Sequence, residues 1–130
     1  MEAMTDKELV LLARAASENA HVPYSGFPVG AALECADGRI FTGCNVENRA
    51  YGGTICAERT AMVKAISEGC RDFARIAVYG DGKEYCYPCG ACRQFMAEFN
   101  DGSMTVLCSR GTEDIKSFVL RELLPGIFGF

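Results

Sequence analysis

The sequence predicts an α/β protein in which helices and strands alternate around a layered sheet. Segments with helical periodicity alternate along the chain with short apolar segments that are typical of strands. The chain has 130 residues, and domains average about 100–200 residues, so we expect a single domain over 1–130. Hydrophobic residues make up 49% of the chain and charged residues 23%, a composition that excludes intrinsic disorder.

The first half of the chain has clear start and stop signals. Thr5-Asp6-Lys7-Glu8 is typical of a capping box, and Pro23 and Gly26 break the helix that it begins. Asp37-Gly38 indicates a tight turn between two strands, and Gly69 ends a second helix. The expected elements are a helix over about 6–20, strands over about 29–36 and 39–46, a loop over 47–55 and a helix over 57–67.

The second half continues the alternation. The expected elements are a strand near 74–79, a turn-rich segment over 80–88, a helix at about 89–99, strands over 104–109 and near 115–119, and a short closing helix. Leu124-Pro125-Gly126 ends that last helix.

Charge and hydropathy exclude several classes of function. With 13 Lys and Arg against 17 Asp and Glu, the net charge is −4, and no basic stripe offers a footprint for a nucleic acid polymer. No apolar run reaches the ~18 residues of a membrane helix, and the acidic start is unlike a signal peptide. We therefore expect a cytoplasmic protein with reduced thiols, in which Cys35, Cys44, Cys70 and Cys108 are small hydrophobic residues.

Two cysteine clusters carry the strongest chemical signal. Cys56-Ala57-Glu58 and Pro88-Cys89-Gly90-Ala91-Cys92 both lie where a loop becomes a helix. A C-x-x-C pair alone also fits a redox site, but a third thiol at another helix start favours a metal. Helix N-termini stabilise thiolates, the form that binds zinc, so the sequence predicts a zinc site.

The number of thiolates decides what kind of zinc site this is. Three thiolates leave one position of a tetrahedral zinc open, as in catalytic sites. Cys86, at the spacing of a further ligand, would instead close the site as a structural one. Glu58 favours the catalytic alternative because an activated water needs a base within reach, although positions two apart lie about 200° apart on a helix.

Five segments together resemble the small homotetrameric cytidine deaminases in their three-cysteine form. The resemblance covers nearly the whole chain. The matching segments are 27–33 (FPVGAAL), 45–48 (NVEN), 56–60 (CAERT), 88–94 (PCGACRQ) and 122–126 (ELLPG).

The resemblance implies a three-layer α/β/α sandwich with a five-stranded mixed sheet. It implies a hydrolase of pyrimidine salvage that deaminates free cytidine and deoxycytidine to uridine and deoxyuridine plus ammonia. One Zn²⁺ per chain would be held by Cys56, Cys89 and Cys92, with Glu58 as the catalytic acid and base. Arg59 would offset the thiolate charge by donating hydrogen bonds to the sulfurs, although its spacing fits a surface ion pair equally well.

The resemblance also implies a set of substrate contacts. Phe27 would line the pyrimidine pocket, Asn45 and Glu47 would hold the sugar, Ala57 would contact the substrate, and Phe128 of a neighbouring subunit would complete the site in a homotetramer. From the residues alone, Phe27 is more typical of a core position, and Asn45 and Glu47 also fit a turn-capping pair. By the same resemblance, Tyr51 is expected to contact a neighbouring subunit. His21 is expected to be a surface or packing residue.

Two other functions compete with this interpretation. A deaminase of a cytosine-nucleoside antibiotic of the blasticidin S type shares the zinc motifs but lacks the Asn-Val-Glu-Asn segment found at 45–48. A non-catalytic binding module stapled by zinc would need a closed metal shell and would leave Glu58 without a role.

Overall fold

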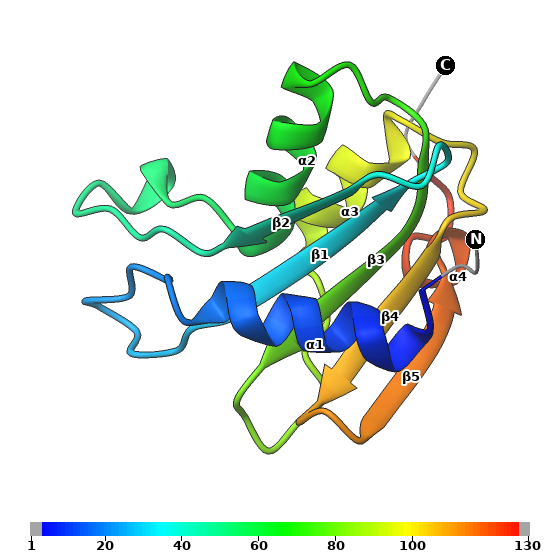
Figure 1. Cartoon of the computed structure of the whole chain (residues 1–130). Helices are drawn as coiled ribbons and strands as arrows, with labels where there is room; N and C mark the ends of the chain where they lie inside the picture. The colour runs from blue at the N-terminus through cyan, green and yellow to red at the C-terminus, as the bar shows by residue number, and fades with distance from the viewer. Residues whose placement is uncertain (1–3, 128–130) are drawn as a thin grey trace.

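The computed structural model describes residues 4–127, and within them five strands form one sheet in the order β2-β1-β3-β4-β5 (Figure 1). The elements in chain order are α1 (Asp6–Ser17), β1 (Val29–Cys35), β2 (Ile40–Cys44), the 3₁₀ turn η1 (Tyr51–Gly53), α2 (Ala57–Ser67), β3 (Phe73–Gly80), α3 (Gly90–Ala97), β4 (Thr105–Arg110), β5 (Asp114–Val119) and α4 (Leu120–Leu123). No helix in this range has the length and hydropathy needed to cross a membrane.

The sheet is mixed, as expected. β3 and β4 run parallel, whereas β1 pairs antiparallel with both β2 and β3, and β4 pairs antiparallel with β5. The parallel pair requires a crossover, and α3 lies on that connection. The predicted α/β fold with a five-stranded mixed sheet is therefore confirmed.

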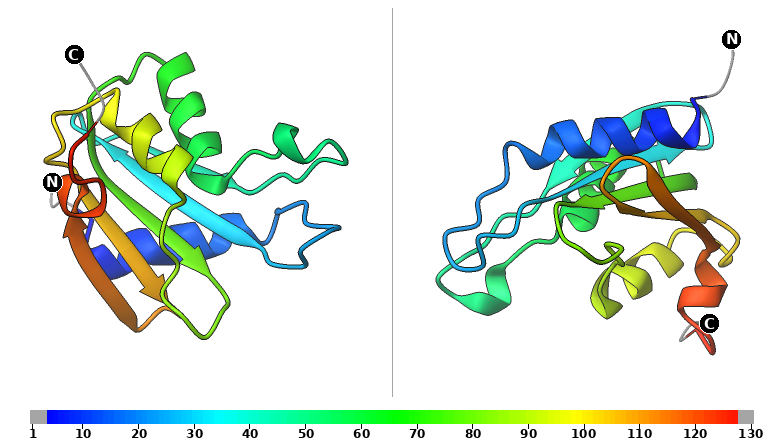
Figure 2. Two further views of the ribbon diagram at one scale, coloured as in Figure 1. Left: turned by 180° about the vertical axis from the view of Figure 1, so that it is seen from behind. Right: turned by 90° about the horizontal axis from the view of Figure 1, so that it is seen from below.

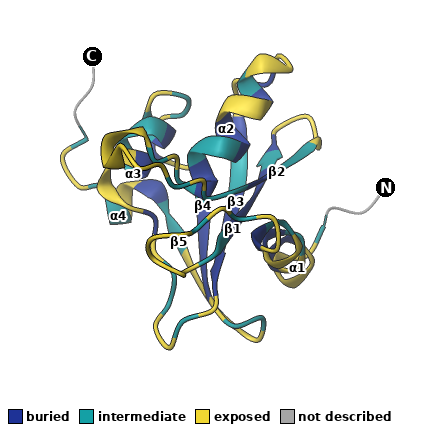
Figure 3. Cartoon of the chain, turned by 90° about the vertical axis from the view of Figure 1, so that its left-hand side faces the viewer, coloured by how far each residue is buried: buried dark blue, intermediate teal, exposed yellow. Residues whose placement is uncertain are grey.

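Helices cover both faces of the sheet and give the chain three layers. The right-hand view of Figure 2 shows α1 on one side of the sheet and α3 on the other, and Figure 3 shows the buried strands between them. Side chains alternate between the faces: Leu33 packs in the core under α2 and α3, and its neighbour Ala32 packs under α1. Burial on both faces explains why β1 and β3 are largely apolar and why β4 has an apolar centre.

The predicted boundaries agree closely with the structure, except at the end of the first helix. α2 has the expected bounds, and the capping box of α1 is present, with Thr5 Oγ1 accepting from Glu8 N at 3.1 Å and Glu8 Oε1 accepting from Thr5 N at 2.8 Å. α1 ends at Ser17 instead of about residue 20, because the chain turns there to bring His21 beside Val46.

Two glycines allow the helices to approach the sheet closely. A Cβ on Gly30 of β1 would lie 1.8 Å from the carbonyl oxygen of Ala13 in α1. On the other face, a Cβ on Gly43 of β2 would lie 2.5 Å from the backbone nitrogen of Ala61 in α2. The contact partners are backbone atoms, so a side chain at either position would push its helix away from the sheet.

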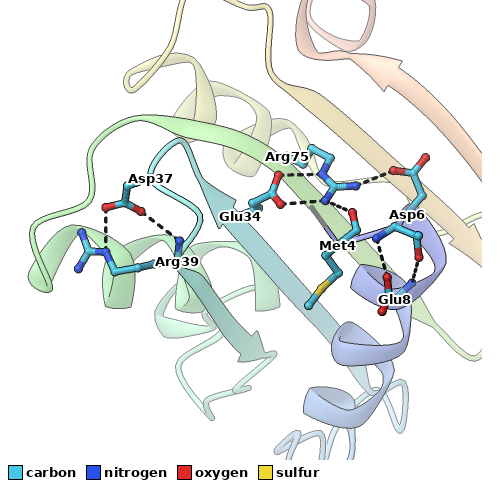
Figure 4. A network of polar contacts seen from close by, with 8 residues as sticks. Met4, Asp6, Glu8, Glu34, Asp37, Arg39 and Arg75 are labelled. Carbon is cyan, nitrogen blue, oxygen red and sulfur yellow. Dashed lines mark hydrogen bonds and ion pairs between the residues drawn. The ribbon is translucent and has the colours of Figure 1, made fainter. Parts of the chain in front are cut away.

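Arg75 ties the start of the chain to the sheet (Figure 4). Its Nε and Nη2 donate to the two carboxylate oxygens of Glu34 at 2.9 and 2.8 Å, and its Nη1 donates to Asp6 Oδ1 at 2.8 Å. These hydrogen bonds hold the pKa of the Glu34 carboxyl below its ordinary value. β1, β3 and the first turn of α1 are thereby joined through one guanidinium group.

The prediction that Cys35 and Cys70 are reduced thiols is wrong. The structure joins them in a disulfide between the end of β1 and the turn after α2, and both residues are buried. Folding brings these segments together, since Ala36 N also donates to Asp72 O at 2.8 Å. Sequence spacing gave no sign of this pairing.

We expect the disulfide to stabilise the fold substantially. It closes a loop of 35 residues, and in the chain-entropy account such a loop contributes about 4 kcal/mol to the free energy of unfolding. The midpoint of urea unfolding of the wild type should therefore shift to a lower urea concentration when a phosphine reductant is present. A Cys35→Ser/Cys70→Ser double variant should be equally destabilised and insensitive to the reductant. Identical wild-type curves with and without reductant would contradict this expectation.

Candidate active site

The site is built where the starts of two helices meet. Cys56 is the N-cap residue of α2, Cys89 is the N-cap residue of α3, and Cys92 lies in the first turn of α3. Neither N-cap side chain bonds a helix amide, so both sulfurs are free to face each other. The positive ends of the two helix dipoles therefore converge on three thiols.

The spacing of the three sulfurs fits a metal. Cys56 Sγ lies 3.6 Å from Cys89 Sγ, Cys89 Sγ lies 3.5 Å from Cys92 Sγ, and all three lie within 4.8 Å of one another. A tetrahedral zinc with Zn–S bonds of about 2.3 Å needs sulfurs about 3.8 Å apart. The thiols therefore lie close to the positions that zinc ligation requires.

Cys86 does not belong to this cluster. Its Sγ lies beside the end of β3, where a Cβ on Gly80 would be 3.0 Å from it. Burial raises the pKa of the Cys86 thiol to about 12, which favours the protonated form. This placement supports three sulfur ligands with one open position.

Arg59 lies against the cysteine cluster. Its Nη2 donates to Cys56 Sγ at 3.6 Å and to the carbonyl of Thr54 at 3.3 Å, and its Nε is buried without a hydrogen-bond partner. A hydrogen bond from the Cys92 thiol, followed by the Arg59 guanidinium, lowers the pKa of Cys56 to about 5. The site thus favours thiolate at Cys56, and the unpartnered Nε suits a thiolate-rich centre.

Glu58 is the buried carboxyl of the site. It lies in the first turn of α2 and is 4% exposed. Burial, and to a smaller extent the negative charge of Cys56, raises its pKa to about 7. The helical offset between positions 56 and 58 does not separate them, because Cys56 precedes the helix as its N-cap while Glu58 turns inward.

Phe27 lies beside the loop that follows β3. Its ring is partly exposed and lines an open pocket of about 390 Å³ together with residues 82–87. A Cβ on Gly80 would lie 2.8 Å from Phe27 Cζ, and one on Gly82 would lie 3.2 Å from Phe27 Cε1. Sequence reasoning missed these two glycines, whose only signal was their position directly after a strand.

Asn45 and Glu47 follow β2 and bond the loop that carries Phe27. Asn45 bonds the backbone on both sides of Pro28, and Glu47 Oε1 accepts from the backbone of Tyr24 and Ser25. The capping role that the sequence left open is therefore present in the structure. The sugar contact remains a prediction.

The other residues singled out from the sequence are Ala57, Tyr51, His21 and Phe128, and those that the structure describes range from buried to exposed. The Ala57 side chain is fully buried, so a substrate contact there would have to use its backbone. Tyr51 is 75% exposed and meets Tyr24 edge-on, with ring centroids 5.7 Å apart. His21 is exposed and pairs with Val46 in an isolated bridge. Phe128 lies outside the described residues.

Comparisons with known proteins agree with this geometry. A family model described as the cytidine and deoxycytidylate deaminase zinc-binding region matches residues 3–108. The cytidine deaminases of Sporosarcina psychrophila and Halalkalibacterium halodurans are each 50% identical to this chain over 125 residues, which make up 96% of this chain and 92% and 95% of theirs.

Solved structures show the same fold. The 1.6 Å crystal structure of cytidine deaminase from Burkholderia pseudomallei matches with a TM-score of 0.92 at 46% identity, over 96% of this chain and 100% of that chain. Cytidine deaminase from Mycobacterium tuberculosis matches with a TM-score of 0.85 at 36% identity, over 98% and 100% of the two chains.

Proposed function

Because this chain belongs to the cytidine deaminase family, we propose that it hydrolyses free cytidine and deoxycytidine to uridine and deoxyuridine, releasing ammonia. One observation carries the proposal: three thiols suited to zinc converge beside a buried carboxyl, Glu58, which interacts with Cys92 and Cys56. A purely structural zinc site would not need a buried carboxyl beside the metal ligands.

The family is zinc-binding, and the thiols of Cys56, Cys89 and Cys92 fit one zinc per chain. Zinc bound there supplies Lewis-acid activation of a water molecule. Arg59 and the two helix N-termini offset the negative charge of the three thiolates. These groups keep the cluster electrostatically compatible with water activation.

Glu58 moves the protons of the reaction. It accepts a proton from the attacking water as the water oxygen bonds to C4 of the pyrimidine, and it delivers a proton to N3. The carboxyl then takes the remaining proton from the hydroxyl now on C4 and passes it to the amino group, so the C4–N bond breaks, ammonia leaves and a carbonyl forms at C4. One water is consumed, and its oxygen remains on the product base.

We expect Phe27, Asn45, Glu47 and Ala57 to hold the substrate. The Phe27 ring faces the base from the open pocket, and the unused hydrogen-bonding capacity of Asn45 and Glu47 contacts the sugar hydroxyls. We expect the backbone of Ala57, in the first turn of α2, to contact the base.

Ammonia release from separate substrates tests the function. The purified protein should contain about one zinc per chain and release ammonia from cytidine and deoxycytidine, with none from blasticidin S or single-stranded DNA. Release from blasticidin S alone would support an antibiotic deaminase. A zinc-loaded protein with no activity on any of these would be a binding module.

We also propose that the active form is a homotetramer. The loops over 21–28 and 45–56 extend beyond the sheet (Figure 1) and carry exposed apolar side chains, including Tyr24, Tyr51 and Ile55. Such a patch favours burial against another copy of the chain. In this arrangement Phe128 of one subunit stacks on the base in the site of its neighbour.

Mixed tetramers test whether Phe128 acts across subunits. Glu58→Gln chains would be unfolded and refolded together with Phe128→Ala chains. At low cytidine, the mixture should exceed the weighted average of the parents, because some sites then combine an intact Glu58 with an intact Phe128. Parents refolded separately and then combined are the control. Activity at the average, in hybrids verified by native mass spectrometry, would contradict action in trans.

A further inference from the structure

The loop between α1 and β1, residues 18–28, contains no helix or strand and yet carries Phe27. Its first part is fixed by backbone bonds to the segment that follows β2. His21 N donates to Asn45 O at 3.0 Å, and Glu47 N donates to His21 O at 2.8 Å. The part nearest Phe27, residues 24–28, has no such backbone pairing with that segment. It is held by side chains and by one backbone bond within the loop, from Gly26 N to Val22 O at 3.0 Å.

The Asn45 side chain bonds both flanks of Pro28. Its Oδ1 accepts from Val29 N at 2.9 Å, and its Nδ2 donates to Phe27 O at 3.0 Å. Only a side chain with both an acceptor and a donor can make this pair of bonds. Each amide atom keeps one further bonding position, so this role is compatible with a sugar contact.

The Glu47 carboxylate holds the turn before Phe27. Its Oε1 accepts from Tyr24 N at 3.0 Å and from Ser25 N at 3.1 Å, and Ser25 Oγ in turn accepts from Phe27 N at 3.0 Å. Both sides of Phe27 are therefore fixed by two side chains that enter from the same segment after β2.

The Phe27 ring has little freedom on its inner side. It packs closely against Gly80 and Gly82, where even an added Cβ would come within 2.8 and 3.2 Å of ring atoms. Its other side opens into the pocket lined by residues 82–87. Small shifts of the loop backbone would therefore move the face of the Phe27 ring that lines the pocket.

We propose that Asn45 and Glu47 are positioning residues for Phe27, so that they determine the affinity for the pyrimidine base independently of any contact with the sugar. The inference rests on the proposed function only in taking the pocket beside Phe27 as the base site. It distinguishes two effects that substitution of Asn45 or Glu47 would otherwise combine: loss of a sugar contact, and displacement of the base-facing ring.

A ligand without sugar hydroxyls at C2′ and C3′ separates the two effects. The dissociation constants of cytidine and 2′,3′-dideoxycytidine would be measured by titration calorimetry in a Glu58→Gln background, where turnover does not consume the ligand. Asn45→Asp keeps the acceptor for Val29 N and replaces the donor to Phe27 O. We expect it to weaken dideoxycytidine binding roughly tenfold, as loss of a partly buried hydrogen bond does.

Phe27→Ala tests whether the effect passes through the ring. In a Phe27→Ala chain, Asn45→Asp should no longer weaken dideoxycytidine binding, because the displaced group is already gone. Asn19→Asp, an exposed site with the same change of charge, should bind both ligands like its parent. Should Asn45→Asp fail to fold, Glu47→Gln carries the same comparison with a smaller effect of roughly threefold, since it retains an acceptor oxygen.

Two results would overturn the inference. Weakened cytidine binding with unchanged dideoxycytidine binding would confine both residues to the sugar. Equal effects of Asn45→Asp with and without Phe27 would show that the ring is not involved. A wild-type protein that binds these ligands and releases no ammonia from cytidine would contradict the proposed function while leaving the positioning role standing.

Discussion

A Glu58→Gln chain is expected to fold and to bind zinc, and to release ammonia from cytidine about 10²–10⁴-fold more slowly than the wild type, the usual contribution of general acid and base catalysis. Glutamine has nearly the same shape as glutamate but cannot accept and return a proton. The site buries Glu58 almost completely, and a neutral amide avoids the desolvation of a buried charge. Stability should therefore not fall with activity.

Glu68→Gln is the matched control, because Glu68 caps the other end of the same helix and is exposed. It should retain wild-type kcat. Steady-state ammonia release, zinc content by mass spectrometry and thermal unfolding would be measured on all three proteins. Wild-type rates from zinc-loaded Glu58→Gln protein would remove the carboxyl from the mechanism.

Replacing Cys56, Cys89 or Cys92 by Ala should abolish zinc binding and activity together. The structure brings the three sulfurs into one cluster, so two remaining thiols make an incomplete ligand set. Each variant should also unfold at lower temperature, since zinc at a thousand times its Kd stabilises the native state by about 4 kcal/mol. Zinc content per chain and unfolding with and without a chelator would measure both effects.

Cys86→Ser provides the control for this series. Cys86 lies only three residues before Cys89 but outside the sulfur cluster. Its serine variant should keep one zinc per chain and remain active. Loss of zinc from Cys86→Ser would make Cys86 a fourth ligand, and a closed four-sulfur site would leave no position for water.

Much of the fold could be predicted because its signals are local. The capping box at Thr5–Glu8, the Asp37-Gly38 turn and Gly69 each act within a few residues, and the elements beside them lie where expected. The end of α1 could not be placed in this way. Helical periodicity continues to Ala20, whereas pairing of His21 with Val46 requires the chain to leave the helix at Ser17.

The zinc-binding thiols could also be predicted because their signals are local, whereas features that depend on tertiary contacts could not. Short motifs at two helix starts identify Cys56, Glu58, Cys89 and Cys92, and the fold brings their elements together. The disulfide depends instead on two segments that meet only in the folded sheet, 35 residues apart in sequence. The bonds of Asn45 to the Phe27 loop are likewise tertiary, and so the sequence left two roles open for this residue.

Cysteine at the N-cap of two helices costs each helix the hydrogen bond that a better N-cap residue would make. Thr5 shows what α1 gains from a bonded cap, and Ser, Thr, Asp or Asn at such a position contributes about 0.5–2 kcal/mol. α2 and α3 both forgo this contribution, because Cys56 and Cys89 make no cap bond. Serine at either position would gain a cap bond but lose zinc, and bound zinc contributes more to stability than one cap bond does. A redesign guided by helix preference alone would therefore lose both stability and activity, and it should hold the two cysteines fixed.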